Sequence, residues 1–317
     1  MIARNKQIAA SAGLIAIVVS SLLIAAIASP VATAATGPCG TLPPAMTNYT
    51  HVVWLWMENH SYDTIIGSPD APYINSLAGA CGLATNYHNI THPSLPNYIG
   101  ATSGLPLADL QVFTSDCNPS HRCSTAAPSI FSQVSSWKAY EESMPTNCDR
   151  KNSGEYAVRH NPPPYFTSLS GCDTFDVPYP ALPNDLASNS LPAFSFITPN
   201  LIDDIHDGTV AQGNAWLQAN VPTILSSSAY QSGNLLLVIT LDEGEGGTAT
   251  DCATNTTDVR CHVPTIVVSP STRAGTQSAT LFNHYSLLGS TEQLLGLPNL
   301  AAADPAGTTS MLNAFNL

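Results

Sequence analysis

Four apolar segments, each of which ends abruptly in polar residues or proline, constrain the fold of this 317-residue chain most strongly. They are residues 50–57 (THVVWLWM), 193–198 (AFSFIT), 234–241 (NLLLVITL) and 263–269 (VPTIVVS). Such segments predict buried strands that carry polar groups at their carboxyl ends. Segments with helical spacing lie between them, at 71–80, 96–103, 209–225 and 284–295. The alternation predicts an α/β fold with a largely parallel central sheet, in which ligands gather beyond the carboxyl ends of the strands.

The segment 109–185 has a different character. It is rich in Pro, Ser, Asn and Cys and shows little periodicity. This composition predicts a long, loop-rich insertion that is pinned by disulfides and lies over the active face. We expect it to belong to one domain that spans residues 35–317, since a chain of this length can build one large core.

The N-terminal residues have the pattern of a secretory signal peptide. Arg4 and Lys6 precede an apolar run at 14–27, and small residues follow at 32–34. We expect cleavage after Ala34, so that the mature protein is secreted and has no stable membrane span. An uncleaved membrane anchor is the alternative, because the apolar run is long for a signal peptide.

Eight cysteines form an even set, which suits disulfide pairing in an exported chain. Cys117 with Cys123, Cys148 with Cys172, and Cys252 with Cys261 would each close a short loop, although the connectivity stays open at this point. A zinc cluster is the competing interpretation, and the lack of any CxxC pair disfavours it.

The charge balance is acidic, with 22 Asp and Glu against nine Lys and Arg. A net charge of −13 makes a nucleic acid an improbable partner. Charged residues make up only 10% of the chain, so clustered carboxylates are informative.

Two pairs of oxygen-bearing residues follow predicted strands, Glu58 with Asn59 and Asp242 with Glu243. Carboxylate and amide oxygens are ligands for a hard divalent cation. Two carboxylates at the end of a buried strand would repel each other unless a cation lies between them. The alternatives are a capping or turn cluster for the first pair and an exposed acidic turn for the second.

Ser94 stands two residues before Pro96, where a helix is expected to begin. Its hydroxyl could cap that helix, with Pro96 in the first turn. Alternatively, it could be a nucleophile beside backbone N–H groups that favour an incoming phosphate, with a cation lowering its pKa.

Five histidines lie close to the predicted strand ends or motifs: His92, His160, His206, His262 and His284. As a set they could bind phosphate oxygens or protonate a leaving group. We assign His206 and His284 to catalysis, and His92, His160 and His262 to substrate binding together with Asn97.

Seven ordered segments resemble the bacterial and fungal phosphoesterases that include acid phosphatases and phospholipases C, within the alkaline-phosphatase-like superfamily. The matching segments are 57–67 (MENHSYDTIIG), 92–104 (HPSLPNYIGATSG), 159–166 (RHNPPPYF), 199–209 (PNLIDDIHDGT), 239–247 (ITLDEGEGG), 262–270 (HVPTIVVSP) and 283–298 (NHYSLLGSTEQLLGLP). The resemblance runs from about Val52 to Leu297, and it implies a three-layer sandwich around a largely parallel sheet.

Carried over by position, the resemblance implies one divalent cation, Ca, Mg, Mn or Zn, held by Glu58, Asn59, Asp242 and Glu243. It makes Ser94 the nucleophile that accepts phosphate, and His206 and His284 groups that hold phosphate or the leaving group. The spacing of Asp203, Asp204 and His206 differs from the Asp-x-x-x-His pattern of two-metal relatives, which puts a second metal in doubt. The chain lacks the C-terminal β domains of the longer phospholipases C, and so it looks more like the short acid phosphatases.

The expected function is therefore hydrolysis of small phosphate monoesters through a phosphoserine intermediate. A phospholipase C or other phosphodiesterase of the same fold is the nearest alternative. A non-catalytic secreted protein that binds a cation or a phosphorylated glycan comes from a different class. An α/β serine hydrolase is disfavoured, because no Gly-x-Ser-x-Gly elbow follows a predicted strand.

Overall fold

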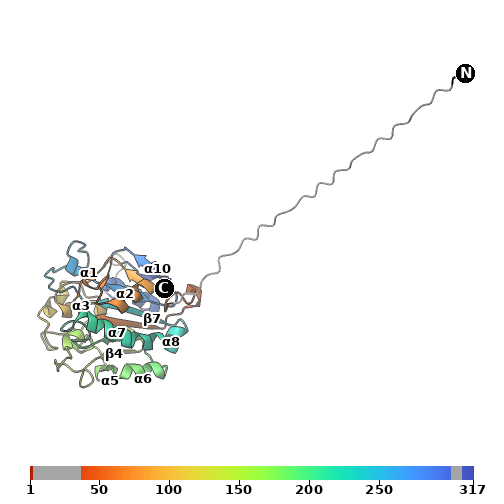
Figure 1. Ribbon diagram of the computed structural model, residues 1–317. Coiled ribbons are helices and arrows are strands. Elements are labelled where there is room, and N and C mark those ends of the chain that lie inside the picture. The colour runs from red at the N-terminus through yellow and green to blue at the C-terminus, as the bar shows by residue number, and fades with distance from the viewer. Residues whose placement is uncertain (3–36, 301–308) are drawn as a thin grey trace. The chain divides into compact units, whose positions relative to one another are not determined.

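The computed structural model describes residues 1–2, 37–300 and 309–317 (Figure 1). The predicted signal peptide falls almost entirely on residues 3–36 and so lies outside the described residues. Residues 35–317 form one compact unit.

An eight-stranded mixed sheet forms the centre of this unit. Its strands follow the order β5 (Asp176–Pro178), β4 (Trp137–Glu141), β6 (Phe194–Thr198), β1 (His51–Met57), β7 (Leu235–Leu241), β8 (Thr265–Val268), β2 (Gly82–Ala84) and β9 (Thr276–Ser278). The first five strands are parallel, whereas β8 runs antiparallel to both β7 and β2. A separate pair joins β3 (Tyr87–His88) to β10 (Phe282–Asn283). All four strands predicted from the apolar segments are therefore present, as β1, β6, β7 and β8.

Strand β1 is buried on both faces, and its side chains point alternately toward two helical layers. Trp54 and Trp56 point to one side, where Trp54 donates to Thr291 of α9 (His284–Leu295) and Trp56 packs on Tyr98 of α3 (Ser94–Ser103). Met57 points to the other side, toward α2 (Pro72–Ala80) and α7 (Val210–Leu225). Because α3 packs on α9 and α2 packs on α7, the unit is a three-layer sandwich, as predicted.

The two longest helices carry clear start signals. Reciprocal capping boxes begin α7 at Thr209 with Gln212 and α9 at Asn283 with Ser286. The remaining helices are short: α1 (Tyr62–Ile65), α4 (Ile130–Gln133), α5 (Cys172–Phe175), α6 (Ala181–Ala187), α8 (Ser228–Gln231) and α10 (Leu312–Phe315). Short 3-10 helices span Pro44–Met46, Asp109–Phe113, Val158–His160, Pro163–Tyr165 and Val259–Cys261. Within the described residues, no helix is both long and apolar enough to cross a membrane.

The segment 109–185 contributes two strands to the main sheet. It adds β4 and β5 to one edge of the main sheet, beside α5 and α6 (Figure 1). The disulfides Cys117–Cys123 and Cys148–Cys172 close loops within it. Its two strands place Glu141 and Asp176 in the core, with exposed fractions of 1% and 0%. The segment is therefore part of the sheet rather than an insertion made of loops alone.

Asp176→Asn is expected to flatten the pH dependence of stability. Burial raises the pKa of Asp176 to about 8, whereas an unfolded Asp titrates near about 4. The neutral carboxyl therefore favours folding at low pH. As the pH rises from about 4 through 8, the free energy of unfolding falls by up to ~1.4 kcal/mol per pH unit from this group. Urea unfolding across this range should show a shallower decline for the variant than for the wild type. Equal slopes would contradict the assignment, and the exposed Asp173→Asn is the matched control.

All eight cysteines pair in the structure. The three short loops expected from the sequence are closed by Cys117–Cys123, Cys148–Cys172 and Cys252–Cys261, and the fourth disulfide joins Cys39 to Cys81. This pairing excludes a zinc cluster of cysteines, because disulfide sulfurs do not ligate zinc as thiolates. Four disulfides indicate that the protein folds in an oxidising compartment.

Candidate active site

The carboxyl ends of β1, β6 and β7 bring three acidic residues to one edge of the sheet. Glu58 follows β1, Asp242 follows β7, and Asp204 lies in the loop after β6. Backbone hydrogen bonds fix the ends together, from Glu58 N to Asp204 O at 2.8 Å and from Asp242 N to Met57 O at 3.1 Å. Asn59 also contributes, because its backbone N donates to Asp242 Oδ1 at 3.1 Å. Adjacent parallel strands thus explain why residues far apart in sequence meet here.

These carboxyls are buried together with Glu243. Glu58, Asp204 and Asp242 are 0% exposed and Glu243 is 7% exposed, which excludes the exposed acidic turn that was the alternative for Asp242 and Glu243. Burial raises the pKa of Glu58 and of Asp242 well above the ordinary range, and the neighbouring carboxyls, Asp242 for Glu58 and Glu243 for Asp242, raise both further. Burial likewise raises the pKa of Asp204 and Glu243. These four carboxyls therefore form a compact set, and they repel each other when no counter-charge is present.

The hydroxyl of Ser94 points into this set. Ser94 Oγ donates to Glu58 Oε2 at 3.2 Å and lies 3.5 Å from Glu243 Oε1. The helix begins two residues earlier than the sequence predicted, so Pro93 is its N-cap and Ser94 is its first residue. The Ser94 hydroxyl is bonded to the carboxyls and does not cap the helix, although the two roles would have been compatible.

The first turn of α3 offers fewer backbone donors than the sequence suggested. Leu95 N donates to Asp116 Oδ1 at 2.9 Å, and Pro96 has no N–H. The N–H of Ser94 alone remains among the first three helical residues. Backbone amides at this helix start can therefore supply only a small part of the charge needed to hold a phosphate.

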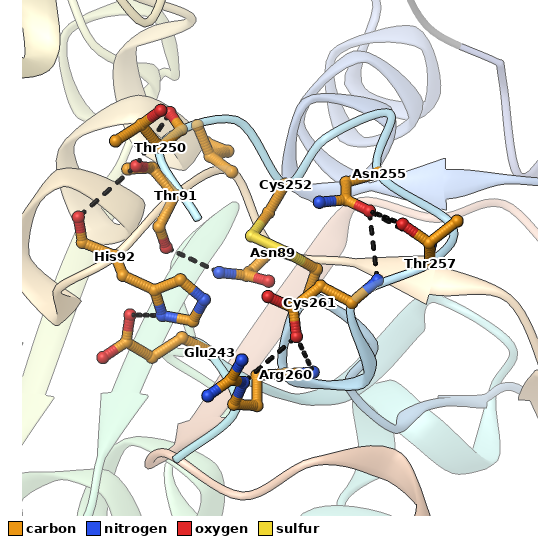
Figure 2. The surroundings of a disulfide bond; sticks show 12 residues. Asn89, Thr91, His92, Glu243, Thr250, Cys252, Asn255, Thr257, Arg260 and Cys261 are labelled. Carbon is orange, nitrogen blue, oxygen red and sulfur yellow. Dashed lines mark hydrogen bonds and ion pairs between the residues drawn. A yellow bond between two sulfur atoms is a disulfide. The ribbon is translucent and has the colours of Figure 1, made fainter. Parts of the chain in front are cut away.

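His92 lies two residues before Ser94 and contacts Glu243. Its Nδ1 is 2.6 Å from Glu243 Oε2, and the side chain is 5% exposed (Figure 2). Its Nε2 is buried and has no hydrogen-bond partner within the described residues. Ser94, Glu243 and His92 thus form a continuous polar chain at the site.

His160 lies between two carboxyls. Its Nε2 is 3.2 Å from Glu58 Oε1, and its Nδ1 is 3.2 Å from Asp204 Oδ2. The ring stacks on Tyr98, whose hydroxyl donates to Glu58 Oε1. These contacts place His160 beside Glu58.

Arg159 brings a permanent positive charge to the same place. Its guanidinium donates to His206 Nε2 at 3.0 Å, so this nitrogen must be the acceptor. The ring proton therefore lies on Nδ1, which donates to Asp207 Oδ1 at 2.7 Å. The charge of Arg159 lowers the pKa of Glu58, Asp204 and Glu243 and so opposes the effect of burial. His206 therefore contacts Arg159 and also lies close to Glu58 and His160.

His284 lies at the end of β7. Its Nε2 lies 2.7 Å from the carbonyl oxygen of Asp242, so this nitrogen carries the proton and donates. Its Nδ1 accepts from the Tyr87 hydroxyl at 3.1 Å, and the ring is fully buried against Trp56. With both nitrogens hydrogen-bonded, His284 holds the end of β7 in place.

Asn97 and His262, for which the sequence predicted substrate binding, contact backbone groups and aromatic rings. Asn97 Oδ1 accepts from the amides of Ile90 and Thr91, and its Nδ2 donates to the carbonyls of Thr91 and Pro93. These bonds shape the loop before Ser94 and leave no capacity for a ligand. His262 stacks between Tyr62 and His88, with ring centroids 4.3 Å and 5.5 Å away.

The donor set fits a hard divalent cation. Asp242 Oδ2 is buried without a partner within the described residues, and the surrounding carboxyls carry raised pKa values that a cation would reverse. Glu58 also approaches His160 and His206 closely enough for the three to share a cation. Oxygen ligands in this number suit Ca²⁺, Mg²⁺ or Mn²⁺ and do not select one of them.

Sequence reasoning missed Tyr98, Asp116 and Arg159. Tyr98 and Arg159 lie in segments that the resemblance itself singled out, which was the available signal. Asp116 lies in the irregular segment 109–185, where no periodicity indicates which residue turns toward the site.

Sequence comparison matches the profile of the Phosphoesterase family to residues 68–298. A phosphatidylinositol-3-phosphatase of Mycobacterium tuberculosis is 33% identical over 279 residues, with 84% of each chain covered. An acid phosphatase of Aspergillus fumigatus is 27% identical over 265 residues, which are 79% of this chain and 56% of the relative. A phosphate-repressible acid phosphatase of Penicillium chrysogenum is 28% identical, over 81% of this chain and 61% of the relative. The chain thus spans little more than half the length of these fungal relatives.

Solved structures share the fold at low identity. A protein of the alkaline phosphatase superfamily from Vibrio parahaemolyticus superposes with a TM-score of 0.51 at 14% identity, covering 84% of this chain and 74% of that one. A phosphonate monoester hydrolase of Agrobacterium radiobacter gives a TM-score of 0.52 at 12% identity, covering 78% and 74%. These similarities confirm the predicted alkaline-phosphatase-like architecture.

Proposed function

The chain belongs to the Phosphoesterase family, and we propose that within it this protein is a secreted, cation-dependent phosphomonoesterase whose nucleophile is Ser94. It is a hydrolase of phosphoric esters, and what we add is the nucleophile, the cation and the preference for monoesters. One observation carries the proposal: the Ser94 hydroxyl, rather than capping its helix, points between Glu58 and Glu243 within a buried carboxyl cluster.

Glu58, Asp242 and Glu243 would hold the cation, and the half-buried side chain of Asn59 is the fourth ligand we propose. When bound, a divalent cation supplies the positive charge that favours the serine alkoxide and polarises a phosphoryl oxygen. The Tyr98 hydroxyl donates to Glu58 Oε1 and so orients this carboxylate, which leaves Oε2 for Ser94.

The chemistry proceeds in two displacements. Ser94 Oγ forms a bond to phosphorus as the bond between phosphorus and the ester oxygen breaks, and the alcohol leaves with a proton. Water then attacks the phosphoserine, which releases inorganic phosphate and restores the Ser94 hydroxyl. The start of α3 offers few free amides for phosphate oxygens. We therefore assign phosphate binding to Arg159, whose guanidinium is oriented by His206.

Substrate preference is tested by comparing p-nitrophenyl phosphate, bis-p-nitrophenyl phosphate and phosphatidylcholine. We expect kcat/KM to be highest for the monoester, because the similar proteins include a phosphatidylinositol-3-phosphatase and acid phosphatases. A preference for either diester would replace the proposal with a phosphodiesterase or phospholipase C. Protein that hydrolyses none of the three but binds a divalent cation would indicate a non-catalytic binding protein.

Secretion is the localisation we propose, since four disulfides need an oxidising compartment. Small phosphate esters are the expected partners, and the acidic charge continues to argue against nucleic acid. Fractionation of an expressing culture, with N-terminal sequencing of the exported protein, tests both export and cleavage after Ala34.

A further inference from the structure

The loop 244–261 binds three consecutive residues that lead to the nucleophile. Asn89 N donates to Cys261 O at 3.0 Å, Cys252 N donates to Ile90 O at 2.8 Å, and Thr91 Oγ1 donates to Thr250 O at 3.2 Å. Figure 2 shows this loop lying along the segment 89–92, with the Cys252–Cys261 disulfide beside the His92 ring. The contacts are backbone bonds for the most part, so they restrain the path of the chain before Ser94.

The Cys252–Cys261 disulfide joins the two residues that hold Ile90 and Asn89. Both cysteines are 0% exposed. Since each anchors a neighbouring residue of the same segment, the covalent bond sets the spacing between the two anchor points. A local disulfide at this place therefore constrains the catalytic segment rather than a distant part of the fold.

Gly247 of the same loop lies directly on the His92 ring. A Cβ at this residue would lie 1.9 Å from His92 Cε1 and 2.0 Å from Nε2, which no pair of atoms tolerates. Arg260 connects the two ends of this loop, because its guanidinium donates to the Gly246 carbonyl at 3.2 Å. The loop thus covers His92 on one side, while Glu243 holds its Nδ1 at 2.6 Å.

We propose that the loop 244–261, closed by Cys252–Cys261, is a clamp that positions the segment 89–92, and through it His92 and Ser94, for phosphoryl transfer. Gly247 and the two cysteines are positioning residues in this assignment, because they touch His92 or its segment and not the reacting atoms. The inference rests on the proposed function, since it takes Ser94 as the nucleophile. Misplacing a catalytic group by about 1 Å can cost on the order of 100-fold in rate.

The two disulfides Cys252–Cys261 and Cys148–Cys172 provide a matched test. The first closes 9 residues and the second closes 24, so removing the second should cost more stability. We expect the double variant Cys252→Ser/Cys261→Ser to lower kcat by roughly 10- to 100-fold with little change in KM. Cys148→Ser/Cys172→Ser should lower the melting temperature more while keeping kcat close to that of the wild type. A kcat that is unchanged in the first variant, or lowered equally in both, would overturn the clamp.

A glycine pair tests the same idea without touching a disulfide. Gly247→Ala should lower kcat because the new methyl group displaces His92, whereas Gly79→Ala meets nothing within 4 Å and should leave kcat unchanged. Wild-type turnover in a variant that folds normally would count against the proposed contact.

Hydrogen exchange separates failure of the clamp from failure of the proposed function. The amides of Asn89 and Cys252 should exchange faster in Cys252→Ser/Cys261→Ser than in Cys148→Ser/Cys172→Ser, whether or not the protein hydrolyses any phosphate ester. Unchanged protection of both amides would overturn the clamp. An inert wild type with this change in protection would instead sink the assignment of Ser94 as a nucleophile and leave the clamp as a fact of the fold.

Discussion

Ser94→Ala is expected to lower kcat/KM for p-nitrophenyl phosphate by at least about three orders of magnitude. The variant removes the only hydroxyl that contacts both Glu58 and Glu243 within the described residues. Its cost in stability should be small, because Ser94 makes no capping bond and its hydroxyl sits among carboxyls. Steady-state kinetics and urea unfolding measure the two quantities.

Ser103→Ala is the control for this experiment. Ser103 lies at the other end of α3, is also buried, and donates to the Ile99 carbonyl at 2.6 Å. We expect near-normal turnover from it. Full activity in Ser94→Ala would remove the nucleophile from the account, and equal losses in both variants would point to a general effect on α3.

Removal of divalent cations is expected to lower activity by about two orders of magnitude or more, because a bound cation supplies several kcal/mol of transition-state stabilisation. It should also lower stability, since Glu58, Asp242 and Glu243 then repel one another in a buried site. Cation at 100 times its dissociation constant should restore about 2.7 kcal/mol of unfolding free energy. Dialysis against a chelator followed by titration of Ca²⁺, Mg²⁺, Mn²⁺ or Zn²⁺ gives both readouts and identifies the preferred ion.

Asp242→Asn tests whether the stability gained on adding a cation comes from binding at Asp242. The variant keeps an acceptor for Asn59 N but removes the charge that Glu243 repels. We therefore expect the cation-free variant to be more stable than cation-free wild type and to gain little on adding the cation. A wild-type gain in the variant, or activity that survives exhaustive chelation in the parent protein, would contradict the proposed ligands.

The central layer of the fold could be predicted from the sequence because its strands are buried on both faces. Runs such as LLLVITL in β7 have few other stable environments, and they end where backbone hydrogen bonds to neighbouring strands end. The direction of β8 was not predictable, since an apolar run looks the same whether it pairs parallel or antiparallel. Strands β4 and β5 were missed because they are short and carry Lys138, Glu141 and Asp176, whose burial depends on tertiary contacts.

The candidate site could be predicted where neighbours in sequence share a strand end, as for Glu58 with Asn59 and Asp242 with Glu243. The roles of single side chains could not, because a histidine or an amide acquires its role from its partners. His284 bonds a carbonyl and a tyrosine, and Asn97 bonds four backbone groups, so both are structural here. Arg159 lay unnoticed beside His160 because nothing local indicates that its charge faces the carboxyls.

Trapping the covalent intermediate tests the central claim most directly. The protein is mixed with excess p-nitrophenyl phosphate, quenched in acid within a few turnovers, digested and analysed by mass spectrometry for phosphorylated peptides. The account predicts one phosphoryl group on the peptide that contains Ser94, located at that residue and missing from Ser94→Ala. A burst of p-nitrophenol equal to the enzyme concentration, with Ser94 unmodified or the phosphoryl group on another residue, would contradict it.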